Sequence, residues 1–157
     1  MFPAPGSCSQ RAPSDLAEGP NGVTGKCRWS VRRPTVRLWI VNYLRLYTDD
    51  HGDARFEDLQ FTFAPRAFAP PAPPVDVSDP IQASAFMMLR LPKGWRDGAH
   101  PAPARQFMIV VDGLVEVSAG GETRLLSPGD VLLAEDTAPP GHATTVIDDA
   151  FVAVTRL

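Results

Sequence analysis

The sequence has little cysteine and no long apolar run, and each shortage excludes a class of protein. Its two cysteines, Cys8 and Cys27, both lie in the N-terminal segment, so a disulfide framework is not implied. No segment approaches the ~18 consecutive apolar residues of a transmembrane helix, and the N-terminus lacks the apolar core of a secretory signal. We therefore expect a cytoplasmic protein with no membrane partner.

Positive charge is scarce beyond the N-terminal segment. Residues 1–40 carry six basic and two acidic side chains, a net charge of +4, which leaves −7 for the remainder of a chain whose formal charge is −3. An acidic domain does not attract phosphate backbones, so we expect no nucleic-acid partner.

The length of 157 residues suits one domain with its own core. Residues 1–36 mix proline, glycine, serine and arginine with few apolar residues. Such a segment cannot bury enough surface to offset its ordering entropy. We predict a disordered extension over residues 1–36 and a folded domain over residues 43–157.

Short apolar runs separated by glycine turns predict β-structure in the second half of the chain. Gln106–Val111 and Leu114–Val117 flank Asp112-Gly113, a step that accepts the backbone angles of a tight turn and predicts a hairpin. Two more turns are predicted at residues 119–122 and 127–130. This spacing, with no helical period, predicts an antiparallel barrel or sandwich.

The first half of the folded domain is less regular. Arg37–Tyr47 suits a strand or one short helix, and Phe56–Phe63 is predicted as a strand. Between them, Thr48–Asp53 combines Asp, His and Gly, which an Asx turn explains without a metal. The proline-rich Ala64–Pro80 favours extended geometry, and we predict a strap that wraps the barrel; an SH3-type ligand is the alternative. Ser84–Leu91 is predicted as a strand.

Two residues on predicted strands are candidates for ligand binding. Alternation along a strand places Arg90 on one face with Phe86 and Met88. Arg90 is therefore either a buried cation that awaits a carboxylate or a rim residue with a solvated head. The same alternation groups Met108 with Gln106, so an inward-facing Gln106 would give a largely apolar pocket that suits a small organic molecule.

Two sets of residues fall at the spacing of a known pair of motifs. Gly94, His100, Gln106 and Gly113 match the first motif (glycine, five residues, His-x-His, Glu, glycine), with Ala102 at the second histidine position and Gln106 in place of glutamate. The second motif begins at Gly129. Glu135 and Thr137 stand where this motif has proline and glycine, and His142 lies two residues beyond the position of its histidine. On these motifs residues 86–154 resemble the cupin superfamily.

The resemblance implies an all-β fold, a single-domain cupin-type jelly-roll β-barrel, that pairs as a homodimer. It also implies a metal site formed by His100, Gln106 and His142 for a divalent ion such as Fe, Mn, Zn or Ni. Because that set carries no negative charge, we expect reduced metal affinity, and Glu135 or Asp136 could supply the missing charge if the loop after them folds inward. The alternative is that both histidines are hydrogen-bonded polar residues at the mouth of an apolar pocket, where imidazoles can exchange protons at neutral pH.

Two functions remain open from the sequence. The first is a small-molecule enzyme, metal-dependent and of oxygenase, isomerase or cyclase type, which the retained His100, Gln106 and His142 favour. The second is a non-catalytic ligand-binding or sensing module with a degenerate metal site, which Ala102 and Gln106 favour. The sequence does not decide whether the domain is an enzyme.

Overall fold

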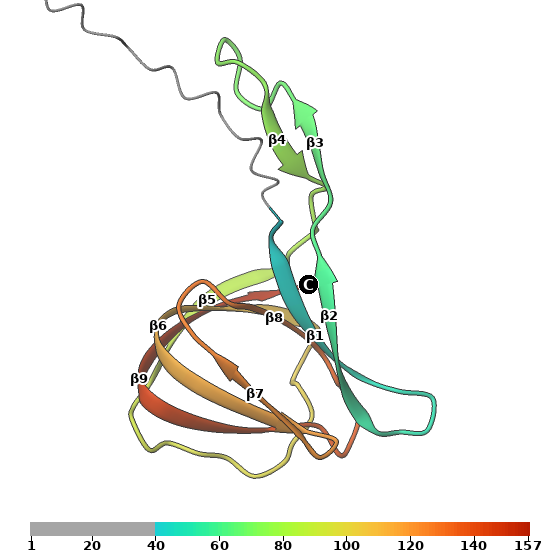
Figure 1. The fold of residues 1–157 in the computed structure, drawn as a ribbon, viewed down its shortest axis with the longest axis vertical. Helices are drawn as coiled ribbons and strands as arrows, with labels where there is room; N and C mark the ends of the chain where they lie inside the picture. Colours follow the sequence, from blue (N-terminus) through green and yellow to red (C-terminus); the bar gives the residue numbers. More distant parts are fainter. Residues whose placement is uncertain (1–39) are drawn as a thin grey trace, which may run out of the picture. The chain divides into compact units, whose positions relative to one another are not determined.

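A computed structural model describes residues 40–157, in which every regular element is a β-strand (Figure 1). The all-β prediction is confirmed. The predicted extension over residues 1–36 lies outside the described residues. No helix in residues 40–157 is long and apolar enough to cross a membrane.

The described chain forms nine strands in two sheets. Seven belong to one sheet, with the order β2-β1-β8-β6-β9-β5 and with β7 paired to β6. The other two form a separate hairpin. The bounds of the strands are β1 (Asn42–Thr48), β2 (Ala54–Gln60), β3 (Phe63–Arg66), β4 (Val75–Ser78), β5 (Ala85–Leu91), β6 (Gln106–Ala119), β7 (Glu122–Leu126), β8 (Val131–Glu135) and β9 (Ala143–Arg156).

The long strands β6 and β9 pair with each other along most of their length and join the remaining strands of the large sheet. The N-terminal half of β6 pairs with β8 and with the end of β9, and its C-terminal half pairs with β7 and with the start of β9. Strands β5 to β9 curve around a common interior in Figure 1. That interior is filled by alternating aliphatic side chains, among which Leu46, Leu132, Val146, Val152 and Val154 are the largest that are fully buried. Burial of such side chains is the main stabilising term.

The predicted hairpin at Asp112-Gly113 is wrong, because β6 continues through it. Gly113 has a φ of +89°, as a turn would require, but the register with β9 shifts at Asp112 and resumes beyond it. The step is therefore a bulge inside a bent strand. A bulge accepts the same positive φ as a hairpin turn, so local chemistry does not distinguish the two.

The predicted strap over Ala64–Pro80 is also wrong. Strands β3 and β4 pair with each other as an antiparallel hairpin, which extends beyond the ends of β1 and β2 (Figure 1). All four residues of β3 are exposed. The other turns agree with prediction: Asp49 Oδ1 accepts the N–H groups of His51 and Asp53, both at 2.9 Å, in an Asx turn.

Candidate functional site

The two motif segments lie side by side at one end of the barrel. The chain before His100 runs antiparallel to the start of β9, where Gly94 N donates to Val146 O at 2.8 Å and Val146 N donates to Trp95 O at 2.8 Å. At the end of this run, His100 and His142 exchange both backbone hydrogen bonds, at 2.9 and 3.0 Å. The pairing of the backbones brings the two imidazole rings together, with centroids 5.0 Å apart.

A glycine makes this approach geometrically feasible. Gly141 has a φ of +71°, and a Cβ atom added to it would lie 2.1 Å from the carbonyl oxygen of His100. Any other residue would have to move one of the two backbones. Gly141 therefore sets the distance between the loop that precedes His142 and the segment that carries His100.

His142 is the buried member of the histidine pair. Its Nδ1 lies 2.6 Å from Oδ2 of Asp136, whose side chain is 0 % exposed. An ionised carboxylate can only accept, so Nδ1 then carries the proton and Nε2 keeps its lone pair. The second oxygen of Asp136, Oδ1, is buried and has no hydrogen-bond partner in the structure, and an unpaired buried oxygen is a group that a ligand or water could satisfy.

Alternation along β8 shows which of the two acidic residues at its end faces the interior. Leu132 and Ala134 are buried, and Leu132 lines the interior, so alternation directs Asp136 inward and Glu135 outward. The sequence had left these two open as suppliers of negative charge. Alternation counted from Leu132 is the signal that would have selected Asp136.

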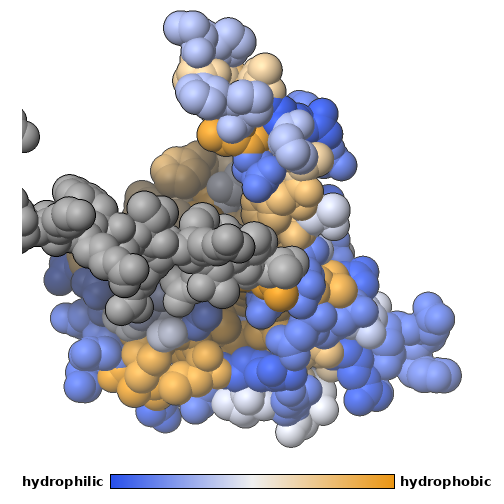
Figure 2. Space-filling view, turned by 45° about the horizontal axis from the view of Figure 1, so that its top comes forward, coloured by the Kyte–Doolittle hydropathy of each residue, from blue (hydrophilic) through white to orange (hydrophobic). Residues whose placement is uncertain are grey.

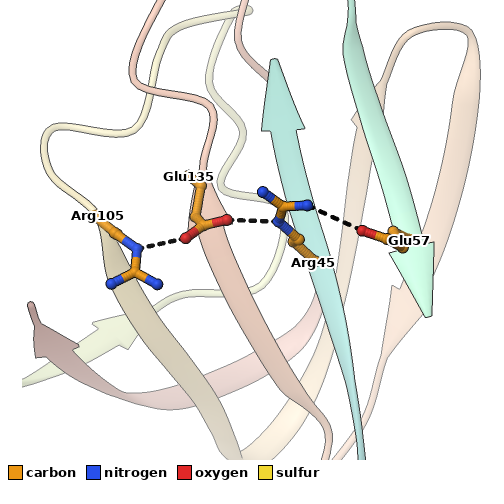
Figure 3. A network of polar contacts seen from close by, with 4 residues as sticks. All are labelled: Arg45, Glu57, Arg105 and Glu135. Atoms are coloured by element: carbon orange, nitrogen blue, oxygen red, sulfur yellow. Dashed lines mark hydrogen bonds and ion pairs between the residues drawn. The ribbon is translucent and has the colours of Figure 1, made fainter. Parts of the chain in front are cut away.

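Glu135 instead belongs to a network of ion pairs on the outside of the sheet (Figure 3). It accepts hydrogen bonds from Arg105 and from Nε of Arg45, the latter at 2.5 Å, and Arg45 also contacts Glu57 at 3.0 Å. Burial works against ionisation of Glu135, but the hydrogen bonds from Arg105 and Arg45 outweigh it and hold the pKa of this carboxyl below its ordinary value of 4.5. The network fixes the end of β8 and thereby the position of Asp136.

The barrel interior beside His142 is almost entirely apolar. It contains a cavity of ≈ 30 Å³, and the polar residues in its lining are His142 and Thr144. A cavity of this size accommodates about one or two water molecules, so a larger ligand has to bind at the mouth. The lining residues are Leu91, Met108, Val110, Val115, Val117, Leu126, Leu132, His142, Thr144 and Val152.

The residues expected to bind a ligand fall in different places. Met108 lines the cavity. Arg90 is exposed on the outer face of β5, whereas its neighbour Leu91 lines the cavity. Alternation along β5 thus excludes Arg90 from the interior, in agreement with the rim alternative.

The donor set expected to hold a metal is only partly assembled. His100 and His142 converge, but the side-chain amide nitrogen of Gln106 points to Met108 Sδ, 3.9 Å away, and Nδ1 of His142 is engaged by Asp136. Among residues 40–157 no group of three His, Cys, Asp or Glu side chains is placed to hold a metal ion. These residues do not fit a tightly held metal, which needs three or four charge-balanced ligands.

Asp97 is a site residue that the sequence analysis missed. Its Oδ1 accepts the N–H of Thr144 at 2.5 Å, and its Oδ2 lies 3.6 Å from Nδ1 of His100. It lies between Gly94 and His100 of the first motif, and this position is the sequence signal that could have identified it. Asp97 ties the segment that carries His100 to the start of β9.

Comparisons with known proteins add little to this geometry. No family model and no curated protein matches the chain. One similar solved structure is the conserved SPY1581 protein of unknown function from Streptococcus pyogenes, at 20% identity over 50% of this chain and 68% of that one, with a TM-score of 0.38. Another is the cupin domain of Cnp3 from Schizosaccharomyces pombe, at 13% identity over 73% of this chain and 85% of that one, with a TM-score of 0.37. At these TM-scores nothing is transferred from either protein.

Proposed function

We propose that this domain is a cupin-like barrel that binds a small, mostly apolar organic molecule at its mouth and accepts a proton from it. The observation that carries the proposal is the buried pair of Asp136 and His142, with 2.6 Å between Oδ2 and Nδ1, at the edge of an apolar interior. An imidazole oriented by a carboxylate is the arrangement by which proteins accept protons from hydroxyl groups.

Each residue has a defined part in this proposal. Nε2 of His142 takes the proton of an acidic hydroxyl on the ligand, and Asp136 stabilises the resulting imidazolium. His100, whose side chain is 46% exposed, contacts the ligand from the solvent side. Met108 and the aliphatic residues beside it face the apolar part of the ligand. Whether the anion is only held or goes on to react separates the binding module from an enzyme of isomerase or cyclase type.

No step in this proposal passes through a metal. A divalent ion held weakly between His100 and His142, whose rings lie 5.0 Å apart, is the second candidate; Gln106 does not complete the set, because its amide nitrogen is turned to Met108. Metal analysis of protein purified without added metal separates the two, because a stoichiometric ion would favour the metal site.

The proposal is tested with two probes of nearly the same shape, 4-nitrophenol and 4-nitroanisole, of which only the first has an acidic hydroxyl. We expect the wild-type chain to bind 4-nitrophenol more tightly, with a rise in phenolate absorbance, and His142→Gln to lose this preference. His51→Gln is the control, because His51 lies in the turn between β1 and β2. Equal affinity for both probes, no binding of either, or an unchanged preference in His142→Gln would contradict the proposal.

A further inference from the structure

Arg156, at the end of β9, is an arginine whose guanidinium is partly buried. Figure 2 shows hydrophilic residues spread over the surface of the described domain, where water hydrates charged groups. Alternation from the buried Val152 and Val154 instead directs the side chain of Arg156 to the inner face of the sheet. Its Nε is buried and, within residues 40–157, has no hydrogen-bond partner. A buried donor on a charged group is costly unless an acceptor reaches it.

Gln106 lies directly beside Arg156. The two residues are partners in the antiparallel register of β6 and β9, so their side chains leave the same face of the sheet. Gln106 is 7% exposed, and its Nε2 contacts Met108 Sδ at 3.9 Å, although a thioether sulfur is a weak acceptor. Two neighbouring buried side chains thus present N–H groups that lack an oxygen acceptor in the described part of the chain.

The side chains around Arg156 do not neutralise its charge. Its register partners on the two neighbouring strands are Ala85 of β5 and Gln106 of β6, and neither carries negative charge. Both acidic residues at the end of β8 are engaged elsewhere, Asp136 in the buried pair and Glu135 in the network of Figure 3. The inner face of the sheet therefore has a cation and an amide donor next to each other without an anion beside them.

These two donors adjoin the site at which a ligand is proposed to bind. Gln106 contacts Met108, and Met108 lines the interior cavity together with His142. Arg156 is only partly buried, so a ligand can reach its guanidinium from the end of the barrel. A ligand that contacts His142 through one polar group can therefore offer a second one to Arg156 and Gln106.

We propose that Arg156 and Gln106 form a binding site for a carboxylate, and that the ligand of this barrel is an apolar molecule with both a carboxylate and an acidic hydroxyl. The carboxylate oxygens accept from Nε of Arg156 and from Nε2 of Gln106, which satisfies both donors and neutralises the cation. The hydroxyl lies at His142. Its position rests on the function proposed above, whereas the carboxylate site follows from Arg156 and Gln106 alone.

The carboxylate site is tested with benzoate and benzamide, which have nearly the same shape and differ in charge. In isothermal titration calorimetry of the full chain, we expect the wild type to bind benzoate more tightly. Arg156→Met should reduce this preference by roughly tenfold or more, because a charge-assisted hydrogen bond is lost. Arg90→Met is the matched control, since it removes the same charge from the exposed face of the neighbouring β5. No preference in the wild type, an unchanged preference in Arg156→Met, or an equal loss in Arg90→Met overturns the proposal.

A second variant keeps the test decisive if Arg156→Met does not fold. Gln106→Glu places a carboxylate of the chain itself beside Arg156, so it should abolish the preference for benzoate and raise the thermal midpoint, measured with a chelator present to exclude metal. Gln60→Glu, at the exposed end of β2, is the control for the added charge. A lower midpoint for Gln106→Glu, or a retained preference for benzoate, overturns the proposal, because a buried carboxylate without a cation beside it is destabilising.

The choice of probes separates this proposal from the function proposed above. Arg156→Met should keep the preference for 4-nitrophenol over 4-nitroanisole, since neither probe carries a carboxylate, and His142→Gln should keep the preference for benzoate over benzamide. A wild type that prefers 4-nitrophenol but not benzoate therefore overturns the carboxylate site alone, and the reverse result overturns the proposed function alone.

The combined ligand is tested with the three hydroxybenzoate isomers. We expect the wild type to bind at least one isomer more tightly than benzoate, and His142→Gln to lose this gain while it still binds benzoate. If no isomer binds more tightly than benzoate, the carboxylate and the hydroxyl do not belong to one ligand, and the proposal of a combined ligand is overturned.

Discussion

His100 and His142 each donate a backbone hydrogen bond to the other, at 2.9 and 3.0 Å, although one precedes β6 and the other precedes β9. The pairing joins the two motif segments at the backbone, so the ring separation of 5.0 Å is set by the fold and requires no bound ion. The two imidazoles differ in their surroundings: His142 is buried against Asp136, and His100 faces solvent. Substitutions at the two histidines should therefore have different consequences.

The first prediction concerns the buried pair. His142→Ala and Asp136→Ala should each lower the free energy of unfolding by about 1–3 kcal/mol, because each leaves a buried polar group without its partner. The double variant should lose less than the sum, by a coupling energy of roughly 0.5–3 kcal/mol, as measured by urea denaturation. His100→Ala is the control and should change the unfolding free energy little, because its side chain is half exposed. Additive losses would show that Asp136 and His142 do not interact in solution.

Much of the β-structure was predictable from the sequence, because alternation and turn residues are local signals. The turn at residues 119–122 and the strand Ala85–Leu91 follow from side chains within a few positions. The bulge at Gly113 was not predictable, since a glycine with positive φ suits a bulge or a hairpin and the choice depends on which strand lies alongside. Proline indicated extended geometry in β3 and β4, but pairing between them depends on distant residues.

The candidate site was predictable in part for the same reason. The motif spacing predicted that His100 and His142 lie close together, and in the structure their backbones pair with each other. The partner of His142 does not follow from motif spacing; the signal that identifies Asp136 is instead the alternation along β8, counted from Leu132. The outward position of Arg90 also depends on which face of β5 the rest of the sheet covers.

The second prediction concerns the bulge in β6. A Cβ atom on Gly113 would lie 2.2 Å from the carbonyl oxygen of Asp149, and its φ of +89° is one that side chains with a Cβ adopt at a cost of about 1–2 kcal/mol. Gly113→Ala should therefore destabilise by more than that strain alone, because the clash with β9 adds to it. Gly121→Ala is the control: it has a similar φ of +80° and nothing within 4 Å. Equal shifts in the urea midpoint for the two variants would show that β6 and β9 separate at the bulge.

The third prediction concerns the pH dependence that Glu135 confers. Its pKa is lowered in the folded state, so its ion pairs stabilise the fold fully above the unfolded value of about 4.5 and lose that contribution as the pH falls through the lower folded value. Glu135→Gln should lower the thermal midpoint at neutral pH, and the gap from the wild type should narrow below about pH 4.5.

Glu57→Gln is the control for this network. Glu57 also contacts Arg45, but its side chain is more exposed than that of Glu135, and an exposed ion pair contributes little. Its effect on the thermal midpoint at neutral pH should be smaller than that of Glu135→Gln. The difference in thermal midpoint between Glu135→Gln and the wild type should not stay constant down to the acid transition. A constant difference would contradict a stabilising role for the ionised Glu135.

The fourth prediction concerns Gly141, which holds the loop before His142 against His100. Its φ of +71° and the 2.1 Å between an added Cβ and His100 O mean that Gly141→Ala must separate the two backbones, at a cost of more than ~1 kcal/mol. The hydrogen bonds between His100 and His142 should weaken, so hydrogen exchange at both amides should accelerate, and the preference for 4-nitrophenol should fall because the backbone that carries His142 is displaced. Gly98→Ala is the control, since Gly98 lies in the same segment as His100 and has open space where a Cβ would be. Unchanged amide exchange in Gly141→Ala would show that the loop can shift without opening the histidine pair, and that the approach at Gly141 does not position the site.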